Sequence, residues 1–434
     1  MNNRKVGNLL IYASLLVTFL LWVLAKDSIG ETVSWPLVSL TQISALLGTM
    51  LFVWSMILST RLDFLESWFG GLDKVYKVHR RVSSVGAVLI LIHPVTLVVS
   101  NLQIGLKYFL PIHNQNPLNL GIYAFWIFAV TILLTLFIHR INLPYHIWKH
   151  SHKFLNLAMI LTLLHVVMIR SDTSLFIPLG LWMNIMVGFG VASGLYMSFF
   201  YEHFGPKYKY EVVNIKRYDG VHDVYLKPSG KKLSYKLAQF AYVSFYSDTI
   251  SKEAHPYCIT SLPEENLLRF SIKELGDYTK TLGGLKIGDT ASAWGPYGRL
   301  GERFKSNSKD AVFVAGGIGV APFLSMFKKA SLSENELLTS LFYCTKYKNE
   351  ASFDSELQKL ADKNGNLKYC NQCSREPDSG GHLSIKQIRK CINDIKNTVI
   401  YLCGPTKMML QIKHDLKTIG IPDRNIVLED FEMI

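Results

Sequence analysis

Hydrophobic patterning divides the chain into two halves of different character. Long apolar runs follow one another up to about residue 201, whereas the chain from about residue 204 onward mixes apolar positions with many Lys, Asp and Glu residues. The apolar runs cover residues 6–25, 36–59, 78–100, 120–138, 150–169 and 174–201. Each is close to the roughly 20 residues that a helix needs to cross about 30 Å of hydrocarbon. The first run lacks a small-residue cleavage site, so we expect a span there rather than a signal peptide, and a six-helix transmembrane bundle over residues 1–203.

The second half has two further patterns, and each predicts a domain. Between residues 208 and 294, short alternating strands are separated by Gly, Pro and Asp turns, which predicts an antiparallel β-barrel within residues 204–304. After Lys309, the stretch AVFVAGGIGVAPFLSMFKK is typical of a buried strand, a glycine turn and a helix with Pro322 in its first turn. Further strands at LLTSLFYC and NTVIYLCGP alternate with helical segments, which predicts a doubly wound α/β nucleotide-binding domain over residues 305–434.

Basic residues gather at one set of predicted helix ends and explain much of the formal net charge of +13. That side carries Arg4, Lys5, Arg61, Lys74, Lys77, Arg80, Arg81, Arg140, Lys149, Lys153, Lys207 and Lys209. The other side has mainly Lys26, Lys107 and Arg170. Because basic residues favour the cytoplasmic side, we expect both termini and the whole second half in the cytoplasm of a cell-membrane protein. The charge then reports topology, and we expect no nucleic-acid partner.

The cysteines all lie in the half predicted to be cytoplasmic, where thiols stay reduced, so we expect no disulfides. They are Cys258, Cys344, Cys370, Cys373, Cys391 and Cys403. Cys370 and Cys373 form a single CxxC motif without a second pair, and we therefore expect no zinc site.

Four histidines within the apolar runs form two matched pairs. His79 and His93 are 14 positions apart on the third run, and His152 and His165 are 13 positions apart on the fifth. An imidazole at membrane depth is costly and points to function. In an alternating topology both helices run in the same direction, so His79 would face His152 and His93 would face His165. A rise of 1.5 Å per residue places the two levels roughly 20 Å apart, which is room for two stacked haems with two histidine ligands each.

The angular spacing of the two pairs is different. Fourteen residues at about 100° each fall about 40° short of four turns, so His79 and His93 share a helix face. Thirteen residues fall about 140° short, so the helix with His152 and His165 needs a bend or bulge. The alternative is that the four side chains are hydrogen-bonded and inert.

The glycine turn after the first strand of the α/β domain favours phosphate binding. Gly316, Gly317 and Gly319 let backbone approach a pyrophosphate, whose charge is stabilised at the N-terminus of the following helix. The pattern is GxGxxP and not the full GxGxxG fingerprint.

The chain has paired histidines on the third and fifth runs, followed in order by the motifs HPYCITS, GDYT, GGIGVAP and CGP. With this combination it resembles the NADPH oxidase and ferric reductase superfamily over nearly its whole length, in particular the compact bacterial oxidase members. The resemblance implies a flavin site at His255, Pro256, Tyr257 and Cys258. Tyr257 would lie against the isoalloxazine and Cys258 near its N5 atom. The family usually has Ser or Thr at this last position, and a thiol is a weaker hydrogen-bond donor.

The same resemblance implies roles for further residues. Those near the FAD pyrophosphate would be Lys273, Gly276 and Thr279. Those holding the pyrophosphate of the nicotinamide nucleotide would be Gly316, Gly317, Ile318, Gly319, Val320 and Pro322. Those bordering the nicotinamide would be Cys403, Gly404 and Pro405. Phe431 would cover the flavin face, or else be a packed core residue, and Ser374 with Arg375 would grip a 2′-phosphate, which favours NADPH over NADH.

These observations predict an oxidoreductase that passes electrons from cytoplasmic NADPH through FAD and two b-type haems to an acceptor outside. Two axial histidines leave no open position on the iron, so oxygen would be reduced at the haem edge to superoxide. The outer loops carry little positive charge, so we expect oxygen as the acceptor, with a ferric chelate as the alternative. Two other possibilities remain. The protein could donate electrons to an extracytoplasmic partner protein, although no protein partner is required, or the spans could merely anchor a flavin reductase.

Overall fold

A computed structural model gives the structure of the chain and describes residues 5–26, 35–100, 105–112, 116–138, 140, 145–304, 309–333, 337–376 and 381–429. The chain divides into two compact units, Met1–Phe204 (unit 1) and Gly205–Ile434 (unit 2).

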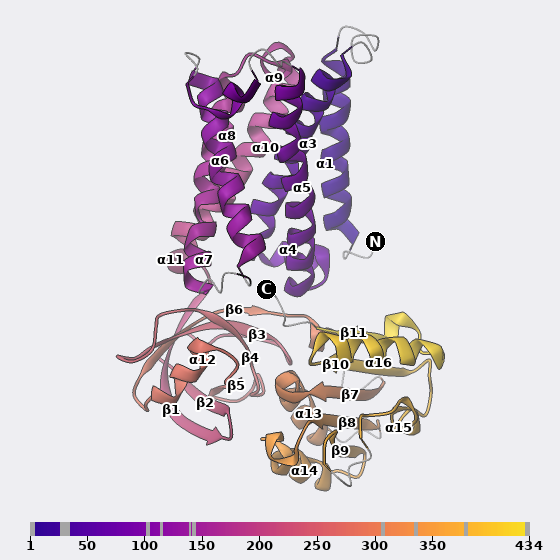
Figure 1. The fold of residues 1–434 in the computed structure, drawn as a ribbon. Coiled ribbons are helices and arrows are strands. Elements are labelled where there is room, and N and C mark those ends of the chain that lie inside the picture. Colours follow the sequence, from indigo (N-terminus) through magenta and orange to yellow (C-terminus); the bar gives the residue numbers. More distant parts are fainter. Residues whose placement is uncertain are drawn as a thin grey trace. The chain divides into compact units, whose positions relative to one another are not determined.

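Unit 1 is a bundle of long apolar helices (Figure 1). Its main helices are α1 (Val6–Leu24), α3 (Pro36–Leu58), α5 (Leu72–Ser100), α6 (Asn116–Phe137), α7 (Tyr145–His152), α8 (Phe154–Met168) and α10 (Ile177–Leu195). The last one continues through a π-helical segment (Tyr196–Phe200) and α11 (Tyr201–Phe204). Shorter helices are α4 (Asp63–Phe69), η2 (Gly105–Phe109) and α9 (Asp172–Leu175). Among the described residues, six helical stretches are long and apolar enough to cross a membrane, as predicted.

The packing of unit 1 suits a lipid environment. Helix α3 packs along α5 and also against α10 and α1, and its Met50 and Val53 are fully buried. On the outside of the bundle, Leu9, Val88 and Leu136 are 57–69% exposed. Helices satisfy their own backbone hydrogen bonds, and such apolar outer faces are stable against lipid tails. The chain is therefore a multi-pass membrane protein.

The first part of unit 2 is an antiparallel β-barrel. Its strand order is β4-β3-β6-β1-β2-β5. The strands are β1 (Lys207–Tyr218), β2 (Val221–Pro228), β3 (Phe240–Tyr246), β4 (His255–Cys258), β5 (Leu268–Lys273) and β6 (Thr290–Tyr297). Just after β4, Ile259 pairs with Phe270 of β5, and the Thr260 amide donates to the Arg269 carbonyl at 2.9 Å, so the two edge strands meet. The closed sheet surrounds an apolar core that includes Phe245 and Phe270.

The second part of unit 2 is a doubly wound α/β domain, as predicted. Its parallel strands are β7 (Asp310–Gly316), β8 (Thr339–Thr345), β9 (Leu367–Cys373), β10 (Thr398–Cys403) and β11 (Ile426–Leu428), in the order β11-β10-β7-β8-β9. One face of the sheet packs on α13 (Ala321–Ser331) and α14 (Asp354–Asp362), and the other on α15 (Ile385–Lys390) and α16 (Thr406–Thr418). The chain reverses its winding direction between β7 and β10, and ligands bind at such a switch point beyond the carboxyl ends of the strands.

Within unit 2, ion pairs ranging from buried to exposed join the barrel to the α/β domain. Arg269 of β5 contacts Asp223 of β2 at 2.7 Å and Glu356 of α14 at 2.7 Å. At a neighbouring contact, Lys329 of α13 pairs with Glu264 at 2.8 Å. The barrel and the α/β domain are therefore held at a defined contact, which fixes the geometry of any site between them.

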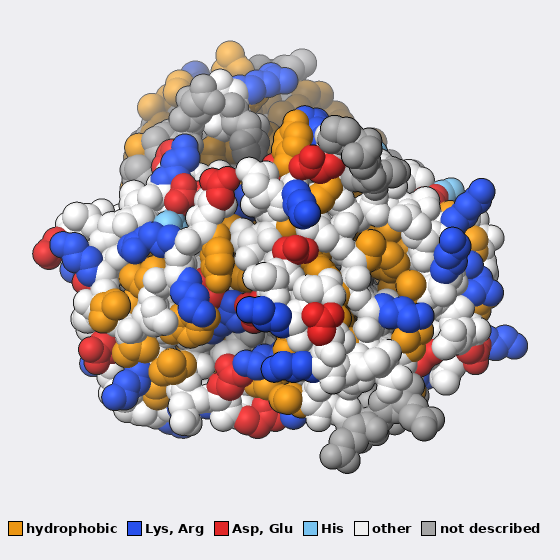
Figure 2. Space-filling model, turned by 90° about the horizontal axis from the view of Figure 1, so that it is seen from below, with side chains coloured by type: hydrophobic (Ala, Val, Ile, Leu, Met, Phe, Trp, Pro, Cys, Tyr) orange, Lys and Arg blue, Asp and Glu red, His pale blue; other side chains and the backbone are white. Residues whose placement is uncertain are grey.

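The surface of unit 2 is mixed in character. Figure 2 shows Lys and Arg side chains interspersed with Asp and Glu and with small apolar areas. Large apolar side chains are exposed singly, such as Leu275 at 73% and Leu410 at 59%. Scattered residues of this kind are normal on a surface in contact with water.

Candidate functional site

The four histidines of unit 1 come together in the predicted pairs. His79 and His93 lie on α5, His152 ends α7, and His165 lies on α8. His79 lies near His152, and His93 lies near His165. All four side chains are half-buried. The bundle therefore holds two separate two-histidine sites at two levels of α5.

Three of these imidazoles are oriented by a backbone carbonyl. The Nδ1 atom of His79 lies 2.9 Å from the Ser55 carbonyl oxygen. The Nδ1 atom of His93 lies 3.0 Å from the Thr41 carbonyl oxygen, and that of His165 lies 2.7 Å from the Pro117 carbonyl oxygen. A carbonyl oxygen only accepts, so in each ring Nδ1 carries the proton and Nε2 keeps its lone pair. Metal-bound histidines are held in this way by their second nitrogen.

His152 is oriented differently. Its Nδ1 is buried and has no hydrogen-bond partner among the described residues, and its ring lies 5.1 Å from that of Trp148. The helix is interrupted immediately afterwards, at Lys153, before α8 begins. Around this point, the amides of Lys153 and Asn156 donate to carbonyls three residues back. The helix that carries His152 and His165 thus has the irregularity that their spacing requires.

Glycine makes room for one of these rings. A Cβ atom at Gly121 of α6 would lie 2.8 Å from Cε1 and Nδ1 of His165, closer than side chains approach one another. Together with the oriented lone pairs, this close packing of the His165 ring on α6 fits a prosthetic group held by one imidazole from each helix. The residues present therefore fit two haems, each of which would be held by one pair of these imidazoles.

In unit 2, the HPYC and GDYT motifs lie side by side. His255, Pro256, Tyr257 and Cys258 form β4, and Tyr278 of α12 (Asp277–Thr281) places its ring 4.1 Å from that of His255. The Tyr257 hydroxyl is buried and has no hydrogen-bond partner among the described residues. A buried hydroxyl without a partner is costly, so a polar ligand group at this place fits the chain.

The segment predicted to hold the FAD pyrophosphate is built around Thr279. Its Oγ1 accepts hydrogen bonds from the amides of Leu275, at 2.8 Å, and Gly276, at 3.0 Å. Lys273 ends β5 just before this loop, and its side chain is half-buried. Thr279 therefore fixes the shape of the loop, and Lys273 is the cation that could face a phosphate there.

The glycine turn and the CGP motif meet at the switch point of the α/β sheet. Gly316 ends β7, Gly317, Ile318, Gly319 and Val320 form a helical turn, and Pro322 lies in the first turn of α13. A Cβ at Gly319 would lie 2.4 Å from the Cys403 carbonyl oxygen, and one at Gly404 only 2.8 Å from the Gly316 Cα. A Cβ at Gly316 would likewise lie 2.6 Å from Cδ of Pro405. Only glycines allow the two loops to approach this closely, which leaves backbone amides available for phosphates.

Cys258 and Cys403 bring the two halves of unit 2 to one place. Burial raises the pKa of the Cys258 thiol well above its usual range, and nearby Cys403 and Glu429 add to the effect. Cys403 itself is buried at the end of β10. Cys258 is therefore a neutral thiol at physiological pH and can donate a weak hydrogen bond. The six cysteines of the chain are all free thiols in the structure.

The residues predicted to contact a 2′-phosphate follow β9. The amide of Ser374 donates to the Thr345 carbonyl and that of Arg375 to the Lys346 carbonyl, both at 2.9 Å. They lie at the carboxyl ends of β8 and β9, the same edge of the sheet as the glycine turn. Phe431 lies outside the described residues.

Three family models match successive parts of the chain. A ferric reductase like transmembrane component matches residues 44–163, an FAD-binding domain matches residues 207–299, and an oxidoreductase NAD-binding domain matches residues 313–414. The chain has the domain architecture of the NADPH oxidase and ferric reductase superfamily. Its successive parts match a transmembrane component, an FAD-binding domain and an NAD-binding domain.

Two proteins similar in sequence each match less than half of this chain. Flavohemoprotein B of Dictyostelium discoideum is 26% identical over 204 residues, which cover 43% of this chain and 47% of its own length. The toluate 1,2-dioxygenase electron transfer component of Pseudomonas putida is 28% identical over 188 residues, 42% of this chain and 55% of that protein. The chain thus spans about half the length of these relatives. A flavohemoglobin structure from Malassezia yamatoensis, with bound FAD and haem, is 20% identical with a TM-score of 0.49 and covers 92% of this chain and 98% of its own.

Sequence reasoning missed residues that lie beside the candidate flavin site. Tyr278 lies within the GDYT motif, but its stacking on His255 has no sequence signal. His222 of β2 is buried and contacts Glu274 at 2.7 Å, in the loop that follows Lys273. The alternation of β2 predicts an inward position for residue 222, and this is the only signal for it.

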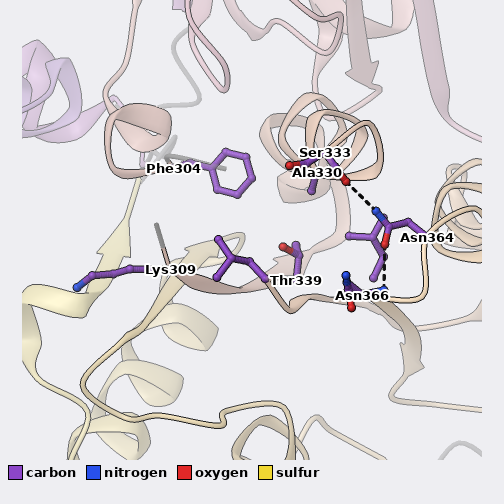
Figure 3. A pocket seen from close by; sticks show the side chains of 9 residues that line it. Phe304, Lys309, Ala330, Ser333, Thr339, Asn364 and Asn366 are labelled. Carbon is purple, nitrogen blue, oxygen red and sulfur yellow. Dashed lines mark hydrogen bonds between the residues drawn. The ribbon is translucent and has the colours of Figure 1, made fainter. Parts of the chain in front are cut away.

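A pocket in the α/β domain lies at the wrong edge of the sheet for a nucleotide (Figure 3). Its lining includes Lys309, Thr339 and Leu367, which lie just before β7 or at the starts of β8 and β9. Asn364 closes one side by donating to the Ser333 carbonyl at 3.2 Å. The strands present their amino ends here, so the pocket is separate from the glycine turn.

Proposed function

We propose that this protein moves electrons from cytoplasmic NADPH, through FAD and two b-type haems, to oxygen on the other side of the membrane, where superoxide is released. The observation that carries the proposal is the arrangement of four histidines in two neighbouring pairs, with three of the rings anchored through Nδ1 to a backbone carbonyl. The matches to a ferric reductase like transmembrane component and to FAD- and NAD-binding domains support it.

The chain's own residues would bind and orient the redox groups. His79 and His152 would hold one haem through Nε2, and His93 and His165 the other. The turn from Gly316 to Val320 would hold the pyrophosphate of NADPH, while Cys258 and Cys403 would border the place where the nicotinamide and the flavin meet. When bound, FAD takes a hydride from NADPH and releases single electrons, which haems can carry.

The histidine geometry argues against the spans being a simple anchor. An anchor gains nothing from imidazoles at membrane depth, because each one costs free energy that an apolar residue would not. Three of these rings donate a hydrogen bond to a backbone carbonyl. The carbonyls belong to Thr41 and Ser55 of α3 and to Pro117 of α6. An arrangement that points each Nε2 in a fixed direction is what a metal ligand needs.

Charge at the end of the bundle that carries His93 and His165 favours oxygen over a ferric chelate. Chelates such as ferric citrate are anionic and would need free positive charge at the entrance. The basic residues that the structure describes at this end are few: Lys107 and Arg170 are exposed, and Lys26 is 8% exposed and already paired with Asp172. Oxygen is small and neutral and needs no such charge.

Ferric reduction is the second candidate, because the family model for the membrane part is described as ferric reductase like. Both functions use the same internal path and differ only in the acceptor.

The test uses the full chain purified in detergent and supplied with FAD. We expect a Soret band, two haems per flavin, and aerobic NADPH oxidation that reduces cytochrome c in a reaction blocked by superoxide dismutase. Each NADPH supplies two electrons and should yield two superoxide ions. Faster reduction of ferric citrate, insensitive to dismutase, would favour the second candidate. A flavin spectrum without a Soret band would refute both.

A further inference from the structure

A polar cluster stands at the end of the bundle that carries His93 and His165. Lys26 Nζ, just after α1, lies 2.6 Å from Asp172 Oδ2 of α9 and 2.7 Å from Gln42 Oε1 of α3. Trp22 Nε1 lies 3.4 Å from the same Gln42 oxygen, and Lys26 Nζ lies 5.5 Å from the Trp22 ring centroid. The cluster thus ties together segments that are up to 146 positions apart in the sequence.

The cluster is enclosed and not a solvated surface contact. The side chains of Lys26 and Asp172 are 8% and 16% exposed. A surface ion pair contributes little, whereas a buried pair must overcome a large desolvation cost and persists only with good geometry and additional hydrogen bonds. Lys26 meets these conditions, since it contacts a carboxylate, an amide oxygen and an aromatic face.

One backbone step connects this cluster to a histidine. Gln42 follows Thr41, whose carbonyl oxygen lies 3.0 Å from His93 Nδ1. The Thr41 Oγ1 lies 2.7 Å from Thr96 Oγ1, and the Thr96 hydroxyl lies 3.0 Å from the His93 carbonyl oxygen. The start of α3 is therefore held by the ion pair on one side and presents the carbonyl that orients His93 on the other.

We propose that Lys26, Asp172 and Gln42 form a positioning clamp that fixes the His93 ring and thereby the electronic state of the group held by His93 and His165. The inference rests on the proposed function, because it concerns the haem at that pair. None of the three residues touches the haem in this account. They act through the Thr41 carbonyl, which sets the orientation of the ligand and how strongly it donates to the iron.

The clamp variants are Lys26→Met and Asp172→Asn. Each opens the ion pair but changes the local charge in the opposite direction. Lys26→Arg is the conservative variant, and Gln42→Leu removes the link to α3 while leaving the ion pair in place. Arg170→Gln is the matched control, since Arg170 is an exposed cation two positions from Asp172 and outside the clamp.

The readouts are the haem content, the low-spin ferric EPR signals and the stepwise midpoint potentials of the two haems in the purified full chain. We expect Lys26→Met, Asp172→Asn and Gln42→Leu to shift the g values of one haem signal in the same direction and to leave the other unchanged. Lys26→Arg should restore the wild-type signal, and Arg170→Gln should not alter it. The affected signal should be the one that His93→Leu abolishes.

Two results would overturn the clamp. One is unchanged g values in all three opened variants at full haem content. The other is a pair of opposite shifts of midpoint potential in Lys26→Met and Asp172→Asn with unchanged g values. That result would mean that the haem responds only to the change in local charge and that the His93 ring keeps its orientation. If Lys26→Met fails to fold into the membrane, Gln42→Leu still tests the clamp, because this variant keeps the ion pair and removes only the link to α3. A wild-type protein without haem would instead refute the proposed function, and the clamp with it.

Discussion

Replacing Arg269 with Met would separate the barrel from the α/β domain at their main polar contact. Arg269 Nε lies 2.9 and 2.8 Å from the two carboxylate oxygens of Asp223. Its Nη1 and Nη2 lie 2.7 and 2.8 Å from the two carboxylate oxygens of Glu356. Methionine keeps part of the aliphatic stem but removes the charge. Two carboxylates would then be left without their shared cation.

The magnitude follows from burial. Asp223 is 0% exposed and Arg269 8%, whereas Glu356 is 33% exposed. Removing one member of a buried pair costs about 3–5 kcal/mol, because the remaining charge stays desolvated. Most of this cost would come from Asp223. Glu356→Gln keeps the pair with Asp223 and loses only a partly exposed contact, which costs about 1 kcal/mol or less.

The assay is thermal unfolding of the full chain in detergent, followed by the rise in flavin fluorescence as FAD is released. For a domain pair of this size, 1 kcal/mol corresponds to about 2–4 °C, so we expect Arg269→Met to lower the midpoint by about 6–20 °C and Glu356→Gln by at most about 4 °C. Asp223→Asn added to Arg269→Met removes the uncompensated charge and should recover part of the loss. Equal effects of the two single variants would refute the reasoning.

The same contact gives a pH dependence. Burial alone would raise the pKa of Glu356, but the hydrogen bonds and charge of Arg269 hold this pKa below its usual value. Because the folded-state pKa is the lower one, this contribution to stability is fully present above the unfolded pKa of about 4.3 and is lost as the pH falls through the folded value. The midpoint difference between wild type and Glu356→Gln should therefore shrink below about pH 4.

Three further substitutions test the sites directly. His93→Leu should halve the haem content and leave flavin reduction by NADPH intact; unchanged haem content by pyridine haemochrome assay would refute the ligand assignment. Gly121→Ala places a Cβ 2.8 Å from the His165 ring and should lower haem occupancy, whereas Gly188→Ala, which meets nothing within 4 Å, should not; equal occupancy by Soret absorbance would contradict the packing argument. Cys258→Ser supplies a stronger hydrogen-bond donor and should speed flavin reduction in stopped-flow measurements, and a slower rate would show that the thiol is not the relevant donor.

The elements of the fold that could be predicted are those with local signals. A run of about 20 apolar residues identifies a span by itself, and alternation of period two identifies the barrel strands. The alternating strands and helices after Lys309 predict a doubly wound sheet, and the observed order β11-β10-β7-β8-β9 is of this type, since the chain adds strands on both sides of β7. The spacing of the four histidines was also a local signal, since helix geometry converts sequence separation directly into depth.

The partners of these residues could not be predicted. Three histidines are oriented by carbonyls of Thr41, Ser55 and Pro117, and a backbone carbonyl has no sequence signature. Arg269 binds carboxylates 46 positions before it and 87 positions after it, a choice that depends on the closed barrel and its contact with α14. Local patterns therefore identify which residues carry chemistry, and tertiary packing decides how each one is held.

The helix break after His152 shows how the two pairs reach matching positions. Thirteen residues of regular α-helix fall about 140° short of four turns and rise about 19.5 Å, whereas the fourteen between His79 and His93 fall about 40° short and rise about 21 Å. The amide of Lys153 donates to the His150 carbonyl, and that of Asn156 to the Lys153 carbonyl, which is the hydrogen-bond pattern of a 3₁₀ turn. A residue in such a turn rotates by about 120° instead of about 100° and rises about 2.0 Å instead of about 1.5 Å. The break therefore adds both rotation and rise between His152 and His165, which brings the spacing of this pair closer to that of His79 and His93.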